Sequence, residues 1–305
     1  MFGWLDELIF TKNKHMKQKK CHESMVGQLC IITGATSGVG YEAAKKIAEA
    51  GAHVVMVCRN EDKAKIIRKE LKSKYNVFID IIIADFGDLD SVRLLAKELL
   101  LRYPKIDVLV NNVGMYSTQN IHLRNGYEMV FCVNHLAPFL LTYLLIGRLI
   151  ESSPSRIIDV NSEGHRFNGL NVEDINWEKR HYTGLKGDGA AKTAQLLTVW
   201  DYHDLLKDTG VTINALHPGA VKTNRGSNNG WLYRTWTHHV TYKMLKKPII
   251  SGEAIYYLAA SKDMKGESGN FYNLTHEEKP AKHALDRKLG KKIWSMSMEM
   301  VGLSN

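Results

Sequence analysis

The sequence predicts one α/β domain with a doubly wound parallel sheet in a three-layer α/β/α arrangement. Three observations support this prediction. From residue 25 to the C-terminus, short apolar runs alternate with longer helical stretches, which is the order that a parallel sheet with crossover helices requires. The runs are apolar at successive positions, as expected for strands covered on both faces. A glycine-rich segment also separates the first run from the first helical stretch.

The expected strands are six apolar runs, at residues 30–33, 53–58, 77–83, 106–110, 156–160 and 211–216. Helical stretches are expected to begin near Gly38, Glu61, Leu89, Leu123 and Gly189. The last part of the chain adds a helix at about 251–260, a short strand at 269–273 and an amphipathic C-terminal helix. One irregular segment, rich in aromatic and basic residues, interrupts the alternation at about 226–248.

The 305 residues are 44% hydrophobic and 24% charged, which is ample for a globular core. The net charge of +9 and the pI near 9.2 favour a negatively charged partner, such as a phosphorylated cofactor, an anionic membrane or nucleic acid. Because the basic residues are scattered and no sequence motif for nucleic-acid recognition is present, we expect that the protein does not bind nucleic acid. The four cysteines lack metal-ligand spacing, so we expect reduced thiols in the cytoplasm and no metal.

Residues 1–24 are interpreted as a separate N-terminal segment, and residues 25–305 as the domain. Apolar residues recur at helical spacing at Phe2, Leu5, Leu8 and Ile9, and five lysines follow. Such a helix could lie on an anionic membrane, and the alternative is a helix docked on the fold with a solvated tail. No run reaches the roughly 18 apolar residues that a membrane span requires. We therefore expect a cytoplasmic protein, with peripheral membrane contact left open.

The first expected strand leads into a glycine-rich turn and then into a helix. Glycines at this place let the backbone approach a pyrophosphate, and the helix N-terminus offers N–H groups and a positive dipole to hold it. The position between a first strand and a first helix makes the pattern specific. We expect a Rossmann-type dinucleotide site that includes Thr33, Gly34, Thr36, Ser37, Gly38, Val39 and Gly40.

The residue after the second strand indicates which dinucleotide is bound. A free ribose 2′-hydroxyl favours an acidic residue there, but this chain has Arg59, with Lys63 and Lys65 nearby. Because arginine suits a 2′-phosphate, NADP is favoured over NAD. The third strand ends in Asp85-Phe86, where an acid can meet the adenine amine. The fourth leads into Asn112-Val113-Gly114, where glycine keeps the floor near the adenosine clear.

Three motifs together resemble the short-chain dehydrogenase/reductase family: TGxxxGxG at 33–40, NNxG at 111–114 and HPG at 217–219. The resemblance runs from about Gly27 to the C-terminus. Other segments are similar to its retinol dehydrogenase-like branch, namely CRN at 58–60, VNHLAPFLLT at 133–142, RIIDVNSEGH at 156–165 and LHPGAVKT at 216–223. The resemblance implies hydride transfer between a nicotinamide and a carbonyl or alcohol carbon, with a retinoid or other lipophilic compound as substrate.

In that family a tyrosine, a lysine, a serine and an asparagine manage the proton. By position, Asn134 matches the asparagine that holds a water, Ser162 matches the substrate-positioning serine, and Lys192 matches the lysine that binds the ribose and lowers the pKa of the tyrosine. The residue before Ser162 is often a second serine but is Asn161 here. The resemblance also places beside the nicotinamide amide the residues Pro218, Gly219, Val221 and Thr223.

The position of the catalytic tyrosine is occupied by Asp188, four residues before Lys192. Side chains four apart on a helix share one face. A carboxyl has a reference pKa of about 3.9 and a phenol of about 10, so an aspartate has no proton to give a ketone at neutral pH and is a weak base. It is also shorter by a whole ring. Its alternative role is to cap a helix start.

Tyr182 and Lys186 form a second YxxxK pair, but glycines follow at once and no apolar helical face supports it. Three hypotheses remain. The first is an NADP-dependent oxidoreductase of lipophilic carbonyls or alcohols that is impaired at Asp188. The second is a cofactor-binding protein without turnover, which would have no need of Ser162. The third is a peripheral membrane protein that works through residues 1–24 and a substrate lid at about 224–250. The oligomeric state, including a homo-oligomer, is not predicted.

Overall fold

The computed structural model describes residues 16–221 and 247–303. In this part of the chain, eight strands form one sheet in the order β3-β2-β1-β4-β5-β6-β7-β8. The strands are β1 (Leu29–Thr33), β2 (His53–Cys58), β3 (Ile79–Ile83), β4 (Val108–Asn111), β5 (Ser155–Val160), β6 (Val211–His217), β7 (Phe271–Asn273) and β8 (His276–Glu277). All neighbours pair in parallel except β7 and β8, which are antiparallel.

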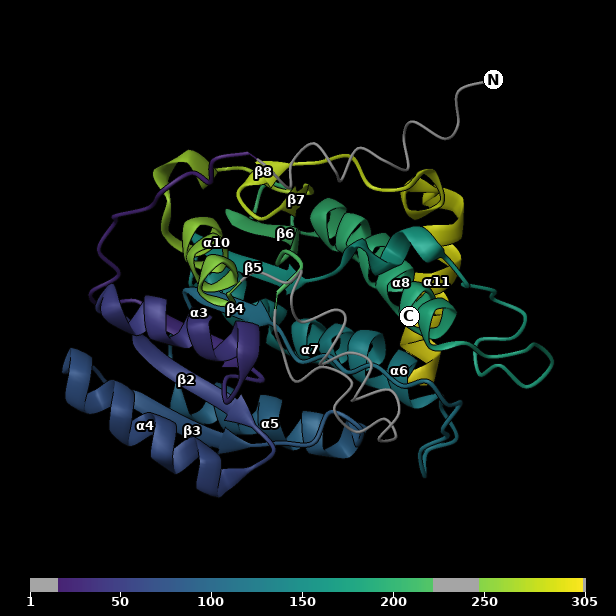
Figure 1. Ribbon diagram of the computed structural model, residues 1–305, viewed down its shortest axis with the longest axis horizontal. Helices are drawn as coiled ribbons and strands as arrows, with labels where there is room; N and C mark the ends of the chain where they lie inside the picture. Colours follow the sequence, from purple (N-terminus) through teal and green to yellow (C-terminus); the bar gives the residue numbers. More distant parts are fainter. Residues whose placement is uncertain (1–15, 222–246, 304–305) are drawn as a thin grey trace.

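Helices cover both faces of the sheet (Figure 1). The longer ones are α3 (Gly38–Glu49), α4 (Glu61–Tyr75), α5 (Leu89–Arg102), α7 (Ala137–Glu151), α8 (Gly184–Leu205), α10 (Ile249–Ala260) and α11 (Arg287–Met300). Shorter turns are α6 (Met129–Phe131), the π-helical η1 (Cys132–Leu136), η2 (Glu163–Phe167), η4 (Lys262–Met264) and η5 (Lys282–Leu285).

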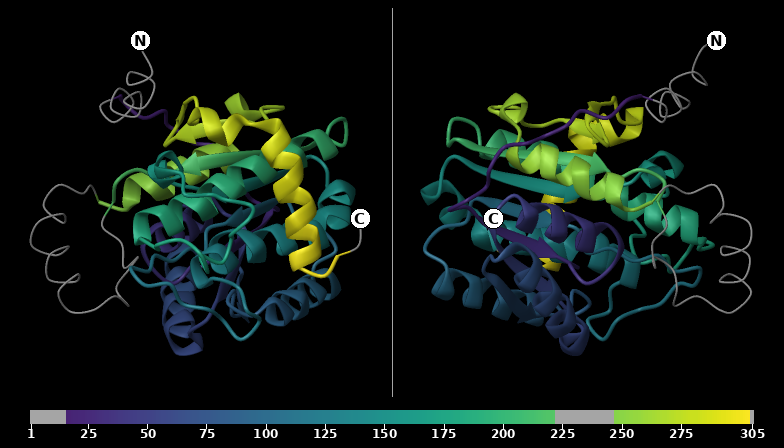
Figure 2. Two further views of the ribbon diagram at one scale, coloured as in Figure 1. Left: turned by 90° about the vertical axis from the view of Figure 1, so that its right-hand side faces the viewer. Right: turned by 60° about the vertical axis from the view of Figure 1, so that its left-hand side comes forward.

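Each face of the sheet has its own hydrophobic core. Helices α3, α4 and α10 enclose one core, and α5, α7 and α8 enclose the other. The C-terminal helix α11 lies across α8 (Figure 2), where Trp294 contacts the rings of Phe139 and Tyr202 edge-on. The predicted three-layer α/β/α domain is therefore confirmed.

Two of the predicted helix starts are wrong. The start expected near Leu123 lies at Met129, because the chain first makes an isolated bridge between His122 and Glu128. The Glu128 carboxylate then caps the new helix by accepting from the amides of Val130 and Phe131. The start expected near Gly189 lies earlier, at Gly184.

The helix α8 begins earlier than expected because Thr183 caps it. The Thr183 hydroxyl oxygen accepts from the amide of Lys186 at 3.3 Å. The first helical turns contain Gly184, Gly187 and Gly189, whose low helix propensity concealed the start in the sequence. Asp188 is therefore inside the helix, and its expected alternative role as the helix cap is wrong.

The described part of the N-terminal segment is tied to the domain. The Lys19 amide donates to the Thr275 hydroxyl at 2.9 Å, and a ring nitrogen of His276 lies 3.0 Å from the Lys17 carbonyl oxygen. The Tyr256 hydroxyl donates to the Glu23 carbonyl. Residues 17–23 are thus attached to the domain, while the side chains of Lys17, Lys19, Lys20 and His22 are exposed to solvent. The predicted helix at residues 2–9 and most of the predicted lid lie outside the described residues.

One buried helical stretch, Met129–Glu151, has 23 residues and contains an 18-residue window with a mean hydropathy of 1.9, which is enough to cross a membrane by length and composition alone. The expectation that no run would qualify is therefore wrong. However, 78% of its most apolar window is buried inside the protein. The stretch packs as a core helix of the α5, α7 and α8 layer.

Candidate active site

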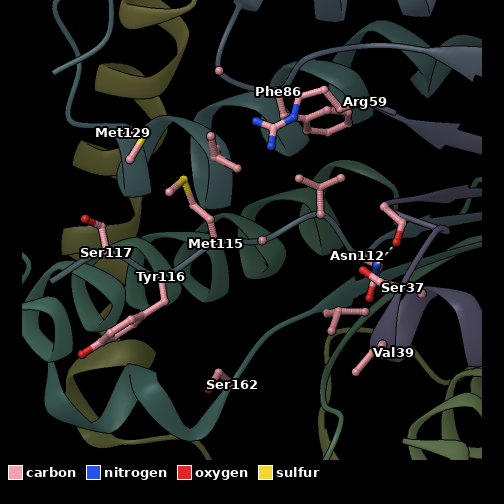
Figure 3. Close-up of a pocket in the computed structure, with 18 of the residues that line it drawn as sticks. Ser37, Val39, Arg59, Phe86, Asn112, Met115, Tyr116, Ser117, Met129 and Ser162 are labelled. Carbon is pink, nitrogen blue, oxygen red and sulfur yellow. Dashed lines mark hydrogen bonds between the residues drawn. The ribbon is translucent and has the colours of Figure 1, made fainter. Parts of the chain in front are cut away.

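A cleft of about 1720 Å³ opens at the carboxyl ends of the parallel strands, which is where doubly wound sheets bind ligands. Figure 3 shows Ser37 and Val39 at one end and Tyr116 and Met129 at the other. The predicted residues that line it are Gly34, Thr36, Ser37, Gly38, Val39, Gly40, Arg59, Asp85, Phe86, Asn112, Val113, Gly114, Ser162, Lys192, Pro218, Gly219 and Val221. Thr33, Asn134 and Asp188 are buried and do not line it. Thr223 lies outside the described residues.

The turn between β1 and α3 has the geometry of an anion cradle. Gly34 and Gly38 have φ angles of 70° and 54°, which glycine adopts without strain. A Cβ on Gly40 would lie 2.3 Å from the Gly34 carbonyl oxygen. Ser37 makes no side-chain cap, and the first turn of α3 has no acidic residue. Because the N–H groups at this helix end have no side-chain acceptor among residues 16–221 and 247–303, the cradle fits a pyrophosphate.

The floor of the cleft is held by Thr33, although that side chain does not reach the cleft. Its hydroxyl oxygen accepts from the amides of Asn112 at 2.8 Å and Val113 at 3.0 Å. The side-chain Nδ2 of Asn112 donates to the Thr33 carbonyl at 2.8 Å. These bonds join the ends of β1 and β4 beneath the cleft.

The end of the cleft next to β2 and α4 carries positive charge. Arg59 and Lys63 are exposed and line the cleft, and Asn60 fixes the start of α4 by accepting from the Lys63 amide at 2.8 Å. Lys65, in contrast, pairs with Glu61 at 2.8 Å and does not line the cleft. Two of the three basic residues noted in the sequence therefore face it.

Asn134 lies in the π-helical turn η1, a local geometry that often occurs at functional sites. Its Oδ1 accepts from the Met115 amide at 2.8 Å, and its Nδ2 donates to the Met115 carbonyl at 3.0 Å. The same Nδ2 donates to Asp188 Oδ1 at 3.2 Å. Asn134 thus connects the loop after β4 to the helix that carries Asp188.

Ser162 and Lys192 approach the cleft from β5 and α8. The Ser162 Oγ accepts from the Gly164 amide at 3.0 Å. Lys192 is 2% exposed, and its Nζ donates to the Val160 carbonyl at 2.7 Å and to Gln195 Oε1 at 3.0 Å. Asn161, in place of a second serine, donates to the Lys192 carbonyl and to Gln195 Oε1. Asn161 therefore braces α8.

Asp188 lies beside Asn134 and Ser162, one helical turn before Lys192. It is 6% exposed. A Cβ on Gly164 would lie 2.7 Å from Asp188 Oδ2 and 3.3 Å from Ser162 Oγ, so both oxygens border the same small space. The structure therefore brings the four residues predicted from the family pattern into one cluster.

Tyr182 packs away from this cluster. Its hydroxyl donates to the Ser117 carbonyl and to Glu128 Oε1, both at 3.4 Å, and its ring meets Trp177 edge-on. Burial, and then the Glu128 carboxylate, raise the pKa of Tyr182 above its ordinary value. Lys186 is exposed. Within the described residues, this second YxxxK pair contributes neither side chain to the cleft.

Tyr182→Phe is expected to leave the turnover of the protein unchanged. The lost hydroxyl makes two long bonds to structural partners, so the free energy of unfolding should fall by about 1 kcal/mol or less. Steady-state kinetics and urea unfolding of the two proteins check this. Loss of turnover with an intact fold would instead assign the proton donor to Tyr182.

Sequence reasoning missed the substrate end of the cleft. Its lining includes Met115, Tyr116, Met129, Phe167 and Leu185. Phe167 and Leu185 are 57% and 51% exposed, so they border the opening. These residues follow carboxyl ends of strands or begin α8, and that placement is the signal by which they could have been found.

The short chain dehydrogenase family profile matches residues 28–230. Retinol dehydrogenase 14 of Mus musculus is 35% identical over 98% of this chain and 94% of its own length. Retinol dehydrogenase 13 of Homo sapiens is 30% identical over 91% of this chain and 85% of its own length. An uncharacterized protein from Mycobacterium paratuberculosis, 25% identical, has a TM-score of 0.75 and covers 94% of this chain and 99% of its own. A short chain dehydrogenase from Shigella flexneri complexed with NADP is 20% identical and has a TM-score of 0.67. The match covers 83% of this chain and 99% of that protein. The chain therefore belongs to the short-chain dehydrogenase/reductase family, as a retinol dehydrogenase-like oxidoreductase of alcohol or carbonyl carbons with a nicotinamide cofactor.

Proposed function

We propose that this protein binds NADPH and reduces a lipophilic aldehyde or ketone, and that Asp188 makes its turnover slow. The observation that carries the proposal is one continuous cleft with basic side chains at one end, Ser162 in the middle and apolar side chains at the other end. The nicotinamide, when bound, supplies the hydride. The retinol dehydrogenases among the relatives and the NADP complex of the Shigella flexneri protein support this assignment.

Each part of the cofactor has a matching group in the cleft. The N-terminus of α3 would hold the pyrophosphate, and Arg59 with Lys63 would hold the 2′-phosphate through charge-assisted hydrogen bonds. Asp85 would accept from the adenine amine. Lys192 would bind the ribose, and Pro218, Gly219 and Val221 would border the nicotinamide amide, a set that Thr223 would complete.

On the substrate side, the Ser162 hydroxyl would donate to the carbonyl oxygen and hold it for reduction. Asn134 would keep the loop at Met115 in place and position a water that carries a proton from solvent. Asp188 would occupy the position of the general acid without donating a proton to the carbonyl oxygen. The apolar side chains of Met115, Met129 and Leu185 favour a lipophilic substrate over a charged one.

A cofactor-binding protein without turnover is the second candidate. The observation that favours it is that the Asp188 carboxylate is buried and bonded to Asn134, the residue proposed to hold the water. Membrane contact also stays a prediction, because residues 1–15 and 222–246 lie outside the described part of the chain. Liposome co-sedimentation with and without residues 1–24 would measure it.

The test combines cofactor binding with turnover. NADPH and NADH are titrated by fluorescence, and NADPH oxidation is followed with a panel of lipophilic aldehydes, for the protein and for Ser162→Ala. We expect NADPH to bind more tightly than NADH, and slow turnover that Ser162→Ala removes while binding remains. Absence of NADPH binding would overturn the proposal. Tight binding without turnover with any aldehyde would favour the second candidate.

A further inference from the structure

A buried cluster of charged side chains lies directly behind Ser162. Glu163 and Arg166 both belong to η2, and Glu278 follows β8. Arg166 Nε donates to Glu163 Oε2 at 2.5 Å, and Arg166 Nη2 donates to Glu278 Oε1 at 2.7 Å. The side chains of Glu163, Arg166 and Glu278 are 16%, 8% and 0% exposed. We call these three residues the clamp.

The clamp joins the turn that carries Ser162 to the far end of the sheet. Glu278 Oε2 accepts from Asn273 Nδ2 at 3.0 Å, and the Glu278 amide donates to the Phe271 carbonyl at 2.8 Å. On the cleft side, the Glu163 amide donates to His217 Nδ1 at 3.3 Å. His217 lines the cleft. Through these contacts the clamp fixes Ser162 relative to both β6 and the β7–β8 hairpin.

The charges of the clamp do not balance when both acids are ionised. Two carboxylates then share one guanidinium in a site with little water, which disfavours one of the negative charges. Glu163 Oε1 is also buried without a hydrogen-bond partner among the described residues. Burial raises the pKa of Glu163 to about 7, aided by the Glu278 carboxylate and opposed by Arg166. The site therefore binds a proton more tightly than a free carboxyl group does.

Other titratable groups surround the clamp on every side. On η2, His165 is fully buried with Nδ1 2.8 Å from the Ser162 carbonyl and Nε2 accepting from the Ala281 amide. Burial lowers the pKa of His165 to about 3, so it stays neutral through the range in which Glu163 titrates. The remaining groups are His217 on β6, His283 on η5 and Asp188 on α8.

We propose that Glu163, Arg166 and Glu278 are positioning residues for Ser162, and that a proton shared by the two carboxyl groups holds the three side chains together. Above neutral pH the second negative charge opens the clamp, so the turn from Ser162 to Phe167 loosens. The inference deepens the proposed function, because Ser162 needs a fixed position only if it binds a substrate oxygen. The clamp itself is tested without turnover.

The test is hydrogen–deuterium exchange of the peptide at 161–168, measured by mass spectrometry at about pH 6 and pH 8 and corrected for the intrinsic pH dependence of exchange. Because a carboxyl with a pKa of about 7 ionises across this interval, the opening constant of the turn should rise about tenfold. Glu278→Gln keeps the shape and removes one of the two negative charges, but Glu163 stays buried, so the rise should become smaller. Glu277→Gln, an exposed neighbour on β8, is the matched control and should keep the rise.

Kinetics separate this inference from the proposed function. In a form that turns over, the KM for the aldehyde should rise above pH 7 with little change in kcat, and Glu278→Gln should reduce that rise. No turnover in any form, with pH-dependent exchange intact, would overturn the proposed function and leave the clamp standing. An equal pH dependence of exchange in the parent and Glu278→Gln, or none in the parent, would overturn the clamp.

Discussion

Asp188→Tyr is expected to raise the turnover of NADPH with a lipophilic aldehyde by about 10²- to 10⁴-fold, the range that a positioned general acid contributes. The new phenol would lie one helical turn before Lys192, whose ammonium group favours the phenolate and so lowers the pKa of the phenol towards neutrality. The tyrosine side chain would also be longer than that of aspartate by a ring. Gly164, which has no side chain, lies against the Asp188 carboxylate and beside Ser162 Oγ, so the new side chain would begin next to Ser162.

The control for this gain is Asp188→Phe. It fills the same space and also loses the bond to Asn134, but it has no hydroxyl, so cofactor binding should persist without a gain in turnover. Turnover is measured by NADPH absorbance, and product is identified by chromatography. If the unaltered chain already turns over as fast as Asp188→Tyr, the assignment of position 188 to the proton donor is wrong.

Arg59→Ala is expected to weaken NADPH binding by about 10- to 100-fold, since a hydrogen bond to a charged group contributes about 1.5–3 kcal/mol. NADH lacks the 2′-phosphate, so its affinity should change little. Fluorescence titrations at fixed ionic strength measure both. Arg68→Ala is the matched control, because Arg68 is an exposed arginine of α4 that does not line the cleft.

Two other results of the Arg59→Ala titrations would be informative. An equal loss for NADPH and NADH would mean that Arg59 supports the fold of the cleft rather than the 2′-phosphate. An equal loss in Arg59→Ala and Arg68→Ala would mean that net charge alone attracts the cofactor. Only a loss confined to NADPH and to Arg59 supports the proposed cofactor preference.

The parts of the fold that local pattern controls could be predicted from the sequence. The apolar strands and the first glycine-rich turn are short-range features, because a buried strand must be apolar and the turn must lie between β1 and α3. The helix starts at Met129 and Gly184 escaped prediction for an equally local reason. Glu128 caps the first helix after a bridge where the sequence predicted a helix. Thr183 caps the second ahead of three glycines that concealed its start.

The long-range contacts of the site could not be predicted. Nothing near Tyr182 in sequence indicates that Gly187 lets its ring pack against α8, where a Cβ would lie 2.4 Å from the Tyr182 hydroxyl. Glu163 and Glu278 are 115 residues apart in the numbering, and only the sheet order brings them together. The bond between Asn134 and Asp188 likewise depends on how η1 faces α8, which one sequence does not encode in any short motif.

The pairing of residues 17–19 with residues 275–276 has a consequence for synthesis of the protein. The Lys19 amide and the Thr275 hydroxyl are separated by 256 residues. At a ribosomal rate of about 5–20 residues per second, Thr275 is synthesised roughly 13 to 50 seconds after Lys19. Glu278 follows Ser162 by 116 residues, so the nascent chain can complete β1 to β6 well before Ser162 acquires its final support.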